Sequence, residues 1–131
     1  GCGGIMRMAP AGLIIHDPTD AFEEGCILAA ITHGHHTGYL CAGFFAGLIQ
    51  YLSEGKSLEV SIALTQHLLQ EWDRNEGTLD AVVDAVNLYN QEKKSGLKIS
   101  EIPKVIEQLG KGWVAEEALA ISLFCDIFIL S

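Results

Sequence analysis

The chain has 131 residues, of which 49% are hydrophobic and 19% charged, so it is not a disordered tail and can bury the core of one domain. Eight Lys and Arg residues against 17 Asp and Glu residues give a net charge of −9. That sign excludes a protein that binds nucleic-acid phosphates or anionic membranes by charge. The mean hydropathy of +0.26 is high for so acidic a chain and predicts more apolar surface than one small domain can hide.

No membrane-spanning helix is expected, because the longest apolar stretches, residues 39–49 and 119–130, are shorter than the roughly 18–20 residues that a span needs. The start of the chain shows no basic region of a signal peptide. The four cysteines, at positions 2, 26, 41 and 125, lack the C-x-x-C spacing of zinc or redox sites. Their even number leaves a disulfide open, whereas the composition favours free, mostly buried thiols in the cytoplasm.

Apolar residues recur at helical spacing along nearly the whole chain, which predicts an all-α fold of about six helices in an orthogonal or irregular bundle. We find no repeat, low-complexity tract or linker, so residues 1–131 are expected to form a single helical domain. Residues 1–15 are the exception and predict a glycine loop that leads into a short irregular or helical turn. A first clear helix follows, with Asp17 as its cap and Pro18 in its first turn.

The middle of the chain predicts two further helices. Residues 32–36 break the first helix, and a second helix is expected over residues 37–53. Gly43 and Gly47 lie on one side of this second helix and let a neighbouring helix approach closely. Ser57 is in position to cap a third helix.

Three more helices are expected in the last part of the chain. Thr78 is expected to cap the fourth, and a short fifth helix opens at Ser100 and ends at Gly110. Trp113 leads into the sixth helix and is interpreted as an anchor in the core. The inner face of that helix is expected to consist of Val114, Ala118, Ile121, Cys125 and Phe128. The last helix and the 39–49 helix are apolar nearly all round, which is typical of helices that are covered on every side.

Closely spaced glycines at the start of the chain are the first candidate for chemistry. Gly1, Gly3 and Gly4 precede Met6-Arg7. Without side chains, such a segment lets backbone N–H groups approach a phosphate or ribose. Taken alone, the spacing favours an ordinary flexible terminus.

Three imidazoles within residues 33–36 are the second candidate. His33, His35 and His36 could hold a metal ion, or serve a polar pocket as hydrogen-bond donors or acid–base groups. Gly34 breaks the helix, and the spacing does not place three rings on one side. The pattern therefore favours a helix-ending turn with one buried histidine and two exposed ones.

Glu116 and Glu117 are the third candidate, because two close carboxylates can hold different pKa values in catalysis. Neighbouring residues on a helix point about 100° apart, however, so these two do not face each other. We therefore interpret them as acids that complement the dipole at the start of the last helix. From the residues alone, the chain contains no complete catalytic set.

Three segments taken together resemble the ADP-ribosylglycohydrolase family. They are residues 1–10 (GCGGIMRMAP), residues 31–39 (ITHGHHTGY) and residues 110–121 (GKGWVAEEALAI), and the resemblance covers residues 1 to about 125. It implies an all-helical, metal-dependent hydrolase that cleaves the glycosidic bond between ADP-ribose and a side chain such as arginine. It also implies two divalent ions, usually magnesium or manganese, that position water and ribose hydroxyls in the complete enzyme.

The resemblance also implies which residues of this chain contact ADP-ribose. Many members carry Asn where this chain has Cys2, and a thiol does not replace the donor and acceptor of an amide. The segment around Trp113 is interpreted as mainly structural. The substrate-binding residues carried over are Cys2, Gly3, Gly4, Met6, His33 and Gly34.

The family's two acidic metal-binding motifs do not occur in this sequence. One is a Thr-Asp-Asp-Thr-like string and the other an Asp-x-Asp-Ser/Thr-like string. We therefore assign no catalytic residue, no metal ligand and no cofactor to this chain. It looks like the middle segment of such an enzyme, truncated or fragmentary and inactive alone, with a residual ADP-ribose pocket.

The expected partners follow from the same interpretation. They are ADP-ribose and either further copies of the chain or missing flanking segments that cover the apolar helices. The alternative is a stand-alone, self-associating helical interaction module without catalysis. A His-rich metal-binding protein is a third hypothesis.

Overall fold

The computed structural model describes residues 1–131 and consists of helices joined by short turns, which confirms the all-α prediction. It has eight α-helices where about six were expected, because residues 1–15 form two short helices. These pack Ile5, Met8 and Ala11 into the core, so tertiary packing stabilises helices too short to form alone. The helices are α1 (Gly3–Met6), α2 (Ala9–Ile14), α3 (Pro18–Ala30), α4 (His36–Ser53), α5 (Leu58–Gln70), α6 (Glu76–Lys94), α7 (Ile102–Ile106) and α8 (Ala115–Leu130), with 3₁₀ turns η1 (Ile99–Glu101) and η2 (Glu107–Leu109) on either side of α7.

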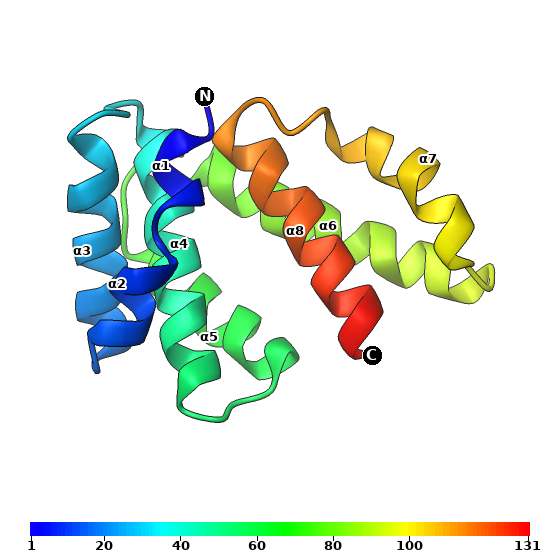
Figure 1. Ribbon diagram of the computed structural model, residues 1–131, viewed down its shortest axis with the longest axis horizontal. Helices are drawn as coiled ribbons and strands as arrows, with labels where there is room; N and C mark the ends of the chain where they lie inside the picture. Colours follow the sequence, from blue (N-terminus) through cyan, green and yellow to red (C-terminus); the bar gives the residue numbers. More distant parts are fainter.

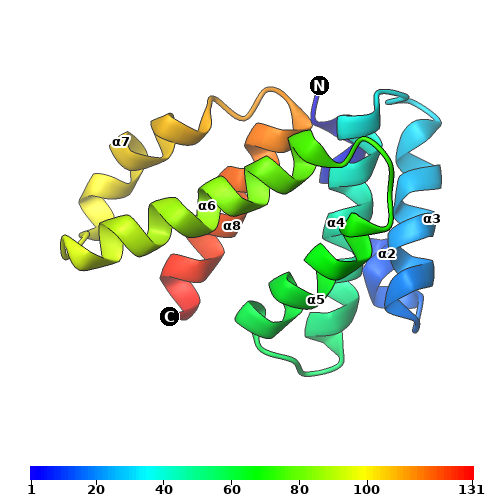
Figure 2. The ribbon, with the colours of Figure 1, turned by 180° about the vertical axis from the view of Figure 1, so that it is seen from behind.

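Helix α4 is the centre of the fold. Helices α1, α2, α3 and α5 pack around it, while α6 and α8 lie side by side and contact it from the other side (Figures 1 and 2). The predicted covering of the 39–49 segment is therefore supplied largely within the chain. Helix α8 differs, because Ile129 and Leu130 near its end are 74% and 68% exposed.

Glycines set the distance between α3 and α4, as the positions of Gly43 and Gly47 predicted. A Cβ on Gly43 would overlap Cys26 Sγ and lie 2.8 Å from the carbonyl oxygen of Phe22. From the other helix, a Cβ on Gly25 would lie 2.8 Å from that of Ala46. The two backbones therefore approach as closely as they do because these positions carry no side chain.

Two of the predicted helix caps are confirmed and one is wrong. Asp17 Oδ1 accepts a hydrogen bond from the N–H of Asp20 at 3.0 Å, and Ser57 Oγ accepts one from Val60 at 3.2 Å. Thr78 does not cap the fourth predicted helix, since α6 begins at Glu76. Thr78 is buried instead, and its hydroxyl lies 3.5 Å from Cys41 Sγ on α4.

The prediction for the start of α8 is wrong in two respects. Trp113 is not a core anchor, because 76% of it is exposed. The buried face of α8 is formed by Ala115, Leu119, Ala120, Leu123 and Phe124, and the five residues predicted for that face are only half-buried. A helix that is apolar all round has no unique inner face in its sequence pattern, so packing against α6 decides which side is buried.

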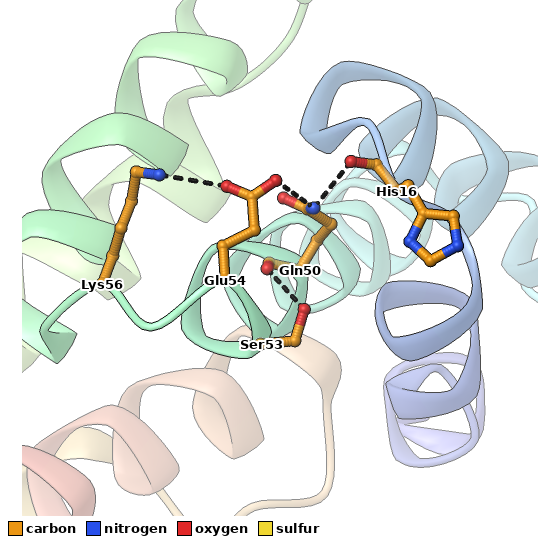
Figure 3. Close-up of polar contacts among 5 residues, drawn as sticks. All are labelled: His16, Gln50, Ser53, Glu54 and Lys56. Atoms are coloured by element: carbon orange, nitrogen blue, oxygen red, sulfur yellow. Dashed lines mark hydrogen bonds and ion pairs between the residues drawn. The ribbon is translucent and has the colours of Figure 1, made fainter.

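A polar cluster closes the far end of α4 (Figure 3). The Gln50 side chain is 2% exposed, and its Nε2 donates hydrogen bonds to the carbonyl oxygen of His16 at 2.8 Å and to Glu54 Oε1 at 2.6 Å. Glu54 Oε2 in turn accepts from Lys56 Nζ at 3.0 Å, and Ser53 donates to the Gln50 carbonyl. The cluster ties the turn between α2 and α3 to α4 and is structural.

All four thiols are free, in agreement with the favoured interpretation of the cysteines. Cys26 and Cys41 are buried, and burial raises the pKa of each to about 12. None of the helices combines the length and the apolar character needed to cross a membrane.

Candidate functional site

The three segments that carry the family resemblance meet at one end of the molecule. Helix α1 contacts α3, α4 and α8, with Gly4 next to Ala29 near the end of α3. Both views show the N-terminus, the loop between α3 and α4, and the start of α8 at this end (Figures 1 and 2). Residues more than 70 positions apart in sequence therefore share one surface.

The glycines of α1 lie against the imidazole of His33. A Cβ on Gly3 would lie 3.0 Å from His33 Cε1 and 3.2 Å from Nε2. A Cβ on Gly4 would lie 3.2 Å from that of Ala29 and 3.6 Å from that of His33. We call Gly3, Gly4 and His33 the glycine–histidine site. Its close packing requires residues without side chains at both glycine positions.

Arg7 fastens this site to the end of α3. Its Nη2 donates hydrogen bonds to the carbonyl oxygen of Leu28 at 2.9 Å and to Thr32 Oγ1 at 2.7 Å. Thr32 Oγ1 lies 2.8 Å from His33 Nδ1. Helix α3 has no basic residue in its own last turn, so Arg7 supplies the positive charge that this helix end favours.

The other predicted binding residues lie outside these contacts. Cys2 is half-buried, with its Sγ 3.5 Å from Met6 Sδ, and Met6 is 75% exposed. Gly34 is exposed, and a Cβ there would meet nothing within 4 Å. The structure thus brings together Gly3, Gly4 and His33, while the binding roles of all six residues stay predictions.

The remaining histidines of the cluster have separate positions. His35 Nδ1 accepts a hydrogen bond from the N–H of Thr37 at 3.2 Å and caps α4, a role that the sequence analysis missed. The rings of His35 and His36 lie 4.0 Å apart, centroid to centroid. The expected helix-ending turn is confirmed, but none of the three histidines is fully buried: His33 and His36 are half-buried and His35 is exposed.

Glu116 and Glu117 have different environments. Glu117 Oε2 accepts hydrogen bonds from the N–H groups of Lys111 and Trp113, both at 3.2 Å, so this carboxylate holds the turn before α8. Glu116 makes no hydrogen bond within the chain. With Asp80 and Asp84 of α6, both glutamates line an acidic hollow of about 280 Å³ between α6, η2 and α8.

The match to a family model covers all three segments and nearly all of the structure just described. Residues 1–127 match the ADP-ribosylglycohydrolase family. The chain belongs to the ADP-ribosylglycohydrolase family. Comparison with curated proteins and with solved structures gave no match.

The two divalent ions implied by the family resemblance can be tested against the side chains present. No group of three or more His, Cys, Asp or Glu side chains is arranged to hold a metal ion. The carboxylates of the acidic hollow do not form such a group, and Glu117 among them is bonded to the backbone.

Proposed function

We propose that this chain binds ADP-ribose at the glycine–histidine site and forms the part of an ADP-ribosylglycohydrolase that recognises ADP-ribose. The observation that carries the proposal is the packing of Gly3 and Gly4 against His33, within 3.0 to 3.6 Å of a hypothetical Cβ. Glycines leave their backbone N–H groups unobstructed by side chains, and here these groups lie beside an imidazole. Both are donors suited to phosphate and ribose oxygens.

Charge supports the glycine–histidine site over the acidic hollow. ADP-ribose carries an anionic diphosphate, and the chain has a net charge of −9. Arg7 is bonded to Thr32 and so places a positive charge next to His33. The hollow, in contrast, is lined by Asp80, Asp84 and two glutamates, which repel an anion.

We further propose that the chain is a truncated or fragmentary member of the family. These 131 residues alone are then not expected to hydrolyse ADP-ribosylated substrates. The two acidic motifs of the family do not occur in the sequence, and the side chains present offer no ligand set for the two ions. The cytoplasm is the proposed location, because four free thiols suit a reducing compartment.

A stand-alone, self-associating interaction module is the second candidate function. It is favoured by large apolar side chains that remain in contact with solvent, each at least two-thirds exposed: Met6, Ile14, Ile31, Ile99, Trp113, Ile129 and Leu130. This candidate predicts a stable homo-oligomer that does not bind ADP-ribose. Light scattering at micromolar concentration measures the first property.

Calorimetric titration with ADP-ribose tests the proposal. The wild type is expected to bind saturably, and His33→Ala to bind roughly tenfold more weakly or worse, the loss typical of a hydrogen bond to a charged group. His67→Ala removes an exposed imidazole from α5 and is the matched control. Circular dichroism confirms that each variant is folded. Binding that His33→Ala leaves unchanged would contradict the proposed site.

The proposed inactivity is tested by an assay that measures the release of ADP-ribose from ADP-ribosyl-arginine, with magnesium or manganese added. No release above the buffer rate is expected. Metal-dependent turnover by the purified chain would overturn the proposed inactivity and leave the binding proposal intact.

A further inference from the structure

We infer that Arg7 and Thr32 are positioning residues that hold neutral His33 as the Nε2–H tautomer, so that its Nε2 donates a hydrogen bond to an oxygen of the bound ligand. The inference rests on the proposed function for the ligand, while the tautomer itself rests on the hydrogen bonds of this chain. Neither Arg7 nor Thr32 was among the predicted binding residues.

The hydrogen bond between Arg7 and Thr32 has only one possible direction. A guanidinium has only donors, so the contact of 2.7 Å from Arg7 Nη2 occupies an acceptor position of the Thr32 hydroxyl. A second contact of Arg7 Nη2, 2.9 Å to the carbonyl of Leu28, holds the guanidinium at the end of α3. The Thr32 hydroxyl therefore accepts from a fixed donor.

The other neighbour of the Thr32 hydroxyl is the imidazole of His33. His33 Nδ1 lies 2.8 Å from Thr32 Oγ1 and is the only other hydrogen-bond partner of this oxygen within the chain. With Arg7 as the donor on one side, we assign the Thr32 hydrogen to Nδ1 on the other; in the opposite arrangement the hydroxyl accepts from both neighbours and the imidazole carries its proton on Nδ1. A neutral imidazole that accepts at Nδ1 carries its proton on Nε2.

The Nε2 atom of His33 lies beside the glycines at the start of the chain. A Cβ on Gly3 would lie 3.2 Å from Nε2, and one on Gly1 would lie 3.7 Å from it. The donor edge of the ring thus faces the glycine segment, and Nε2 has no hydrogen-bond partner within the chain. A hydrogen bond that fixes one ring nitrogen commonly sets the role of the other.

The chain offers a matched pair of variants for Thr32. Thr32→Val keeps the shape of the side chain but has no hydroxyl, whereas Thr32→Ser keeps the hydroxyl. Nitrogen chemical shifts of the imidazole, recorded near pH 8 where an ordinary histidine is neutral, report the tautomer directly. The signals of His33 are assigned from their absence in His33→Ala.

The expected result is Nε2–H in the wild type and in Thr32→Ser, and a shift of population toward Nδ1–H in Thr32→Val. ADP-ribose is expected to bind roughly 3- to 10-fold more weakly to Thr32→Val and with near wild-type affinity to Thr32→Ser. If the role of Thr32 were only structural, Thr32→Val would leave the tautomer of His33 unchanged.

Other outcomes overturn distinct parts of the inference. Two results would show that Thr32 does not set the tautomer of His33, whether or not ADP-ribose binds. One is the Nδ1–H tautomer in the wild type, and the other is a tautomer that Thr32→Val leaves unchanged. If the tautomers are as expected but ADP-ribose does not bind, the proposed function and the donor role of Nε2 are overturned. The assignment of the tautomer then still holds.

Discussion

Helices α3 and α4 form the most closely packed pair in the molecule, whereas the segment around α7 is its most open part. Between α3 and α4, a single added methyl group at Gly43 would overlap a neighbour. Along η1, α7 and η2, no side chain is fully buried, and Ile99 is 77% exposed. The closely packed pair also has the larger share of hydrophobic residues, 18 of 31 in α3 and α4 against 5 of 11 in residues 99–109.

This difference explains where the candidate site forms. The loop that carries His33 connects the two closely packed helices, and Arg7 and the α1 glycines are held against it. The acidic hollow, in contrast, is bordered by the open η2 turn. A preorganised binding surface is therefore expected on the α1–α3–α4 side.

The reactivity of the thiols should show the largest effect, because Cys26 and Cys41 lie in the closely packed α3–α4 pair and Cys2 and Cys125 lie outside it. With its pKa raised to about 12 by burial, each of Cys26 and Cys41 has roughly a thousandfold less thiolate near pH 8 than an ordinary thiol. We expect iodoacetamide to modify Cys2 and Cys125 in the native protein and all four residues in urea. Mass spectrometry counts the labels, and rapid native labelling of Cys26 would show that the α3–α4 contact opens readily.

The same pKa values determine how these thiols affect stability. Unfolded thiols lose their protons near pH 8.5, whereas native Cys26 and Cys41 keep theirs up to about pH 12. Their contribution is therefore complete below about pH 8.5 and declines as the pH rises toward 12. Urea unfolding at increasing pH is expected to follow that decline.

Gly43→Ala should cause the next largest effect. The new Cβ would meet Cys26 Sγ and the Phe22 carbonyl, which cannot move without separating α3 from α4. We expect a loss of roughly 3 kcal/mol in the free energy of unfolding, as for an overpacked core. Gly34→Ala is the control, because its Cβ meets nothing within 4 Å, and it should be neutral or slightly stabilising. Equal stability of the two variants would refute the close contact.

Glu117→Ala should cost about 1 kcal/mol, the usual effect of losing a cap. The variant leaves the N–H groups of Lys111 and Trp113 without their acceptor at the start of α8. Glu116→Ala is the matched control, because its carboxylate accepts no hydrogen bond in the structure. Thermal unfolding compares the two, and a larger loss in Glu116→Ala would contradict the assignment of the cap.

Trp113→Ala should have the smallest effect on stability, below about 0.5 kcal/mol, because 76% of Trp113 is exposed. Phe124 on the buried face of α8 is the contrasting position, and Phe124→Ala should cost about 3–5 kcal/mol. A large loss in Trp113→Ala, measured by urea unfolding, would restore the core role that the sequence suggested.

The sequence predicts those features of the fold that depend on neighbouring residues. Asp17 and Ser57 cap the helices they precede because both partners of each cap lie within three positions. The position of Thr78 could not be predicted, since its hydroxyl lies against Cys41, 37 positions away. The prediction that Trp113 lies in the core was wrong for a related reason. Glu117 holds the turn before α8, and the periodicity of the sequence does not indicate in which direction that turn points the indole.

The candidate site, too, depends on contacts between residues that are far apart in the sequence, so little of it could be predicted from the residues alone. Its three central residues came from the family resemblance, since glycine spacing and histidine spacing alone favoured ordinary structural roles. The hydrogen bond between Arg7 and Thr32 joins residues 25 positions apart and forms only when α1 packs against α3. A lone arginine without an acidic neighbour in sequence was the one signal that could have indicated it.

The most direct test of the account is to map the amide chemical-shift changes that ADP-ribose causes in the whole chain. We expect the largest changes at Gly3, Gly4, Thr32 and His33, with little change in α5 or along η1, α7 and η2. Changes centred on Asp80, Asp84 and Glu116 would place the ligand in the acidic hollow and contradict the account. The absence of any change at saturating ADP-ribose would contradict it as well.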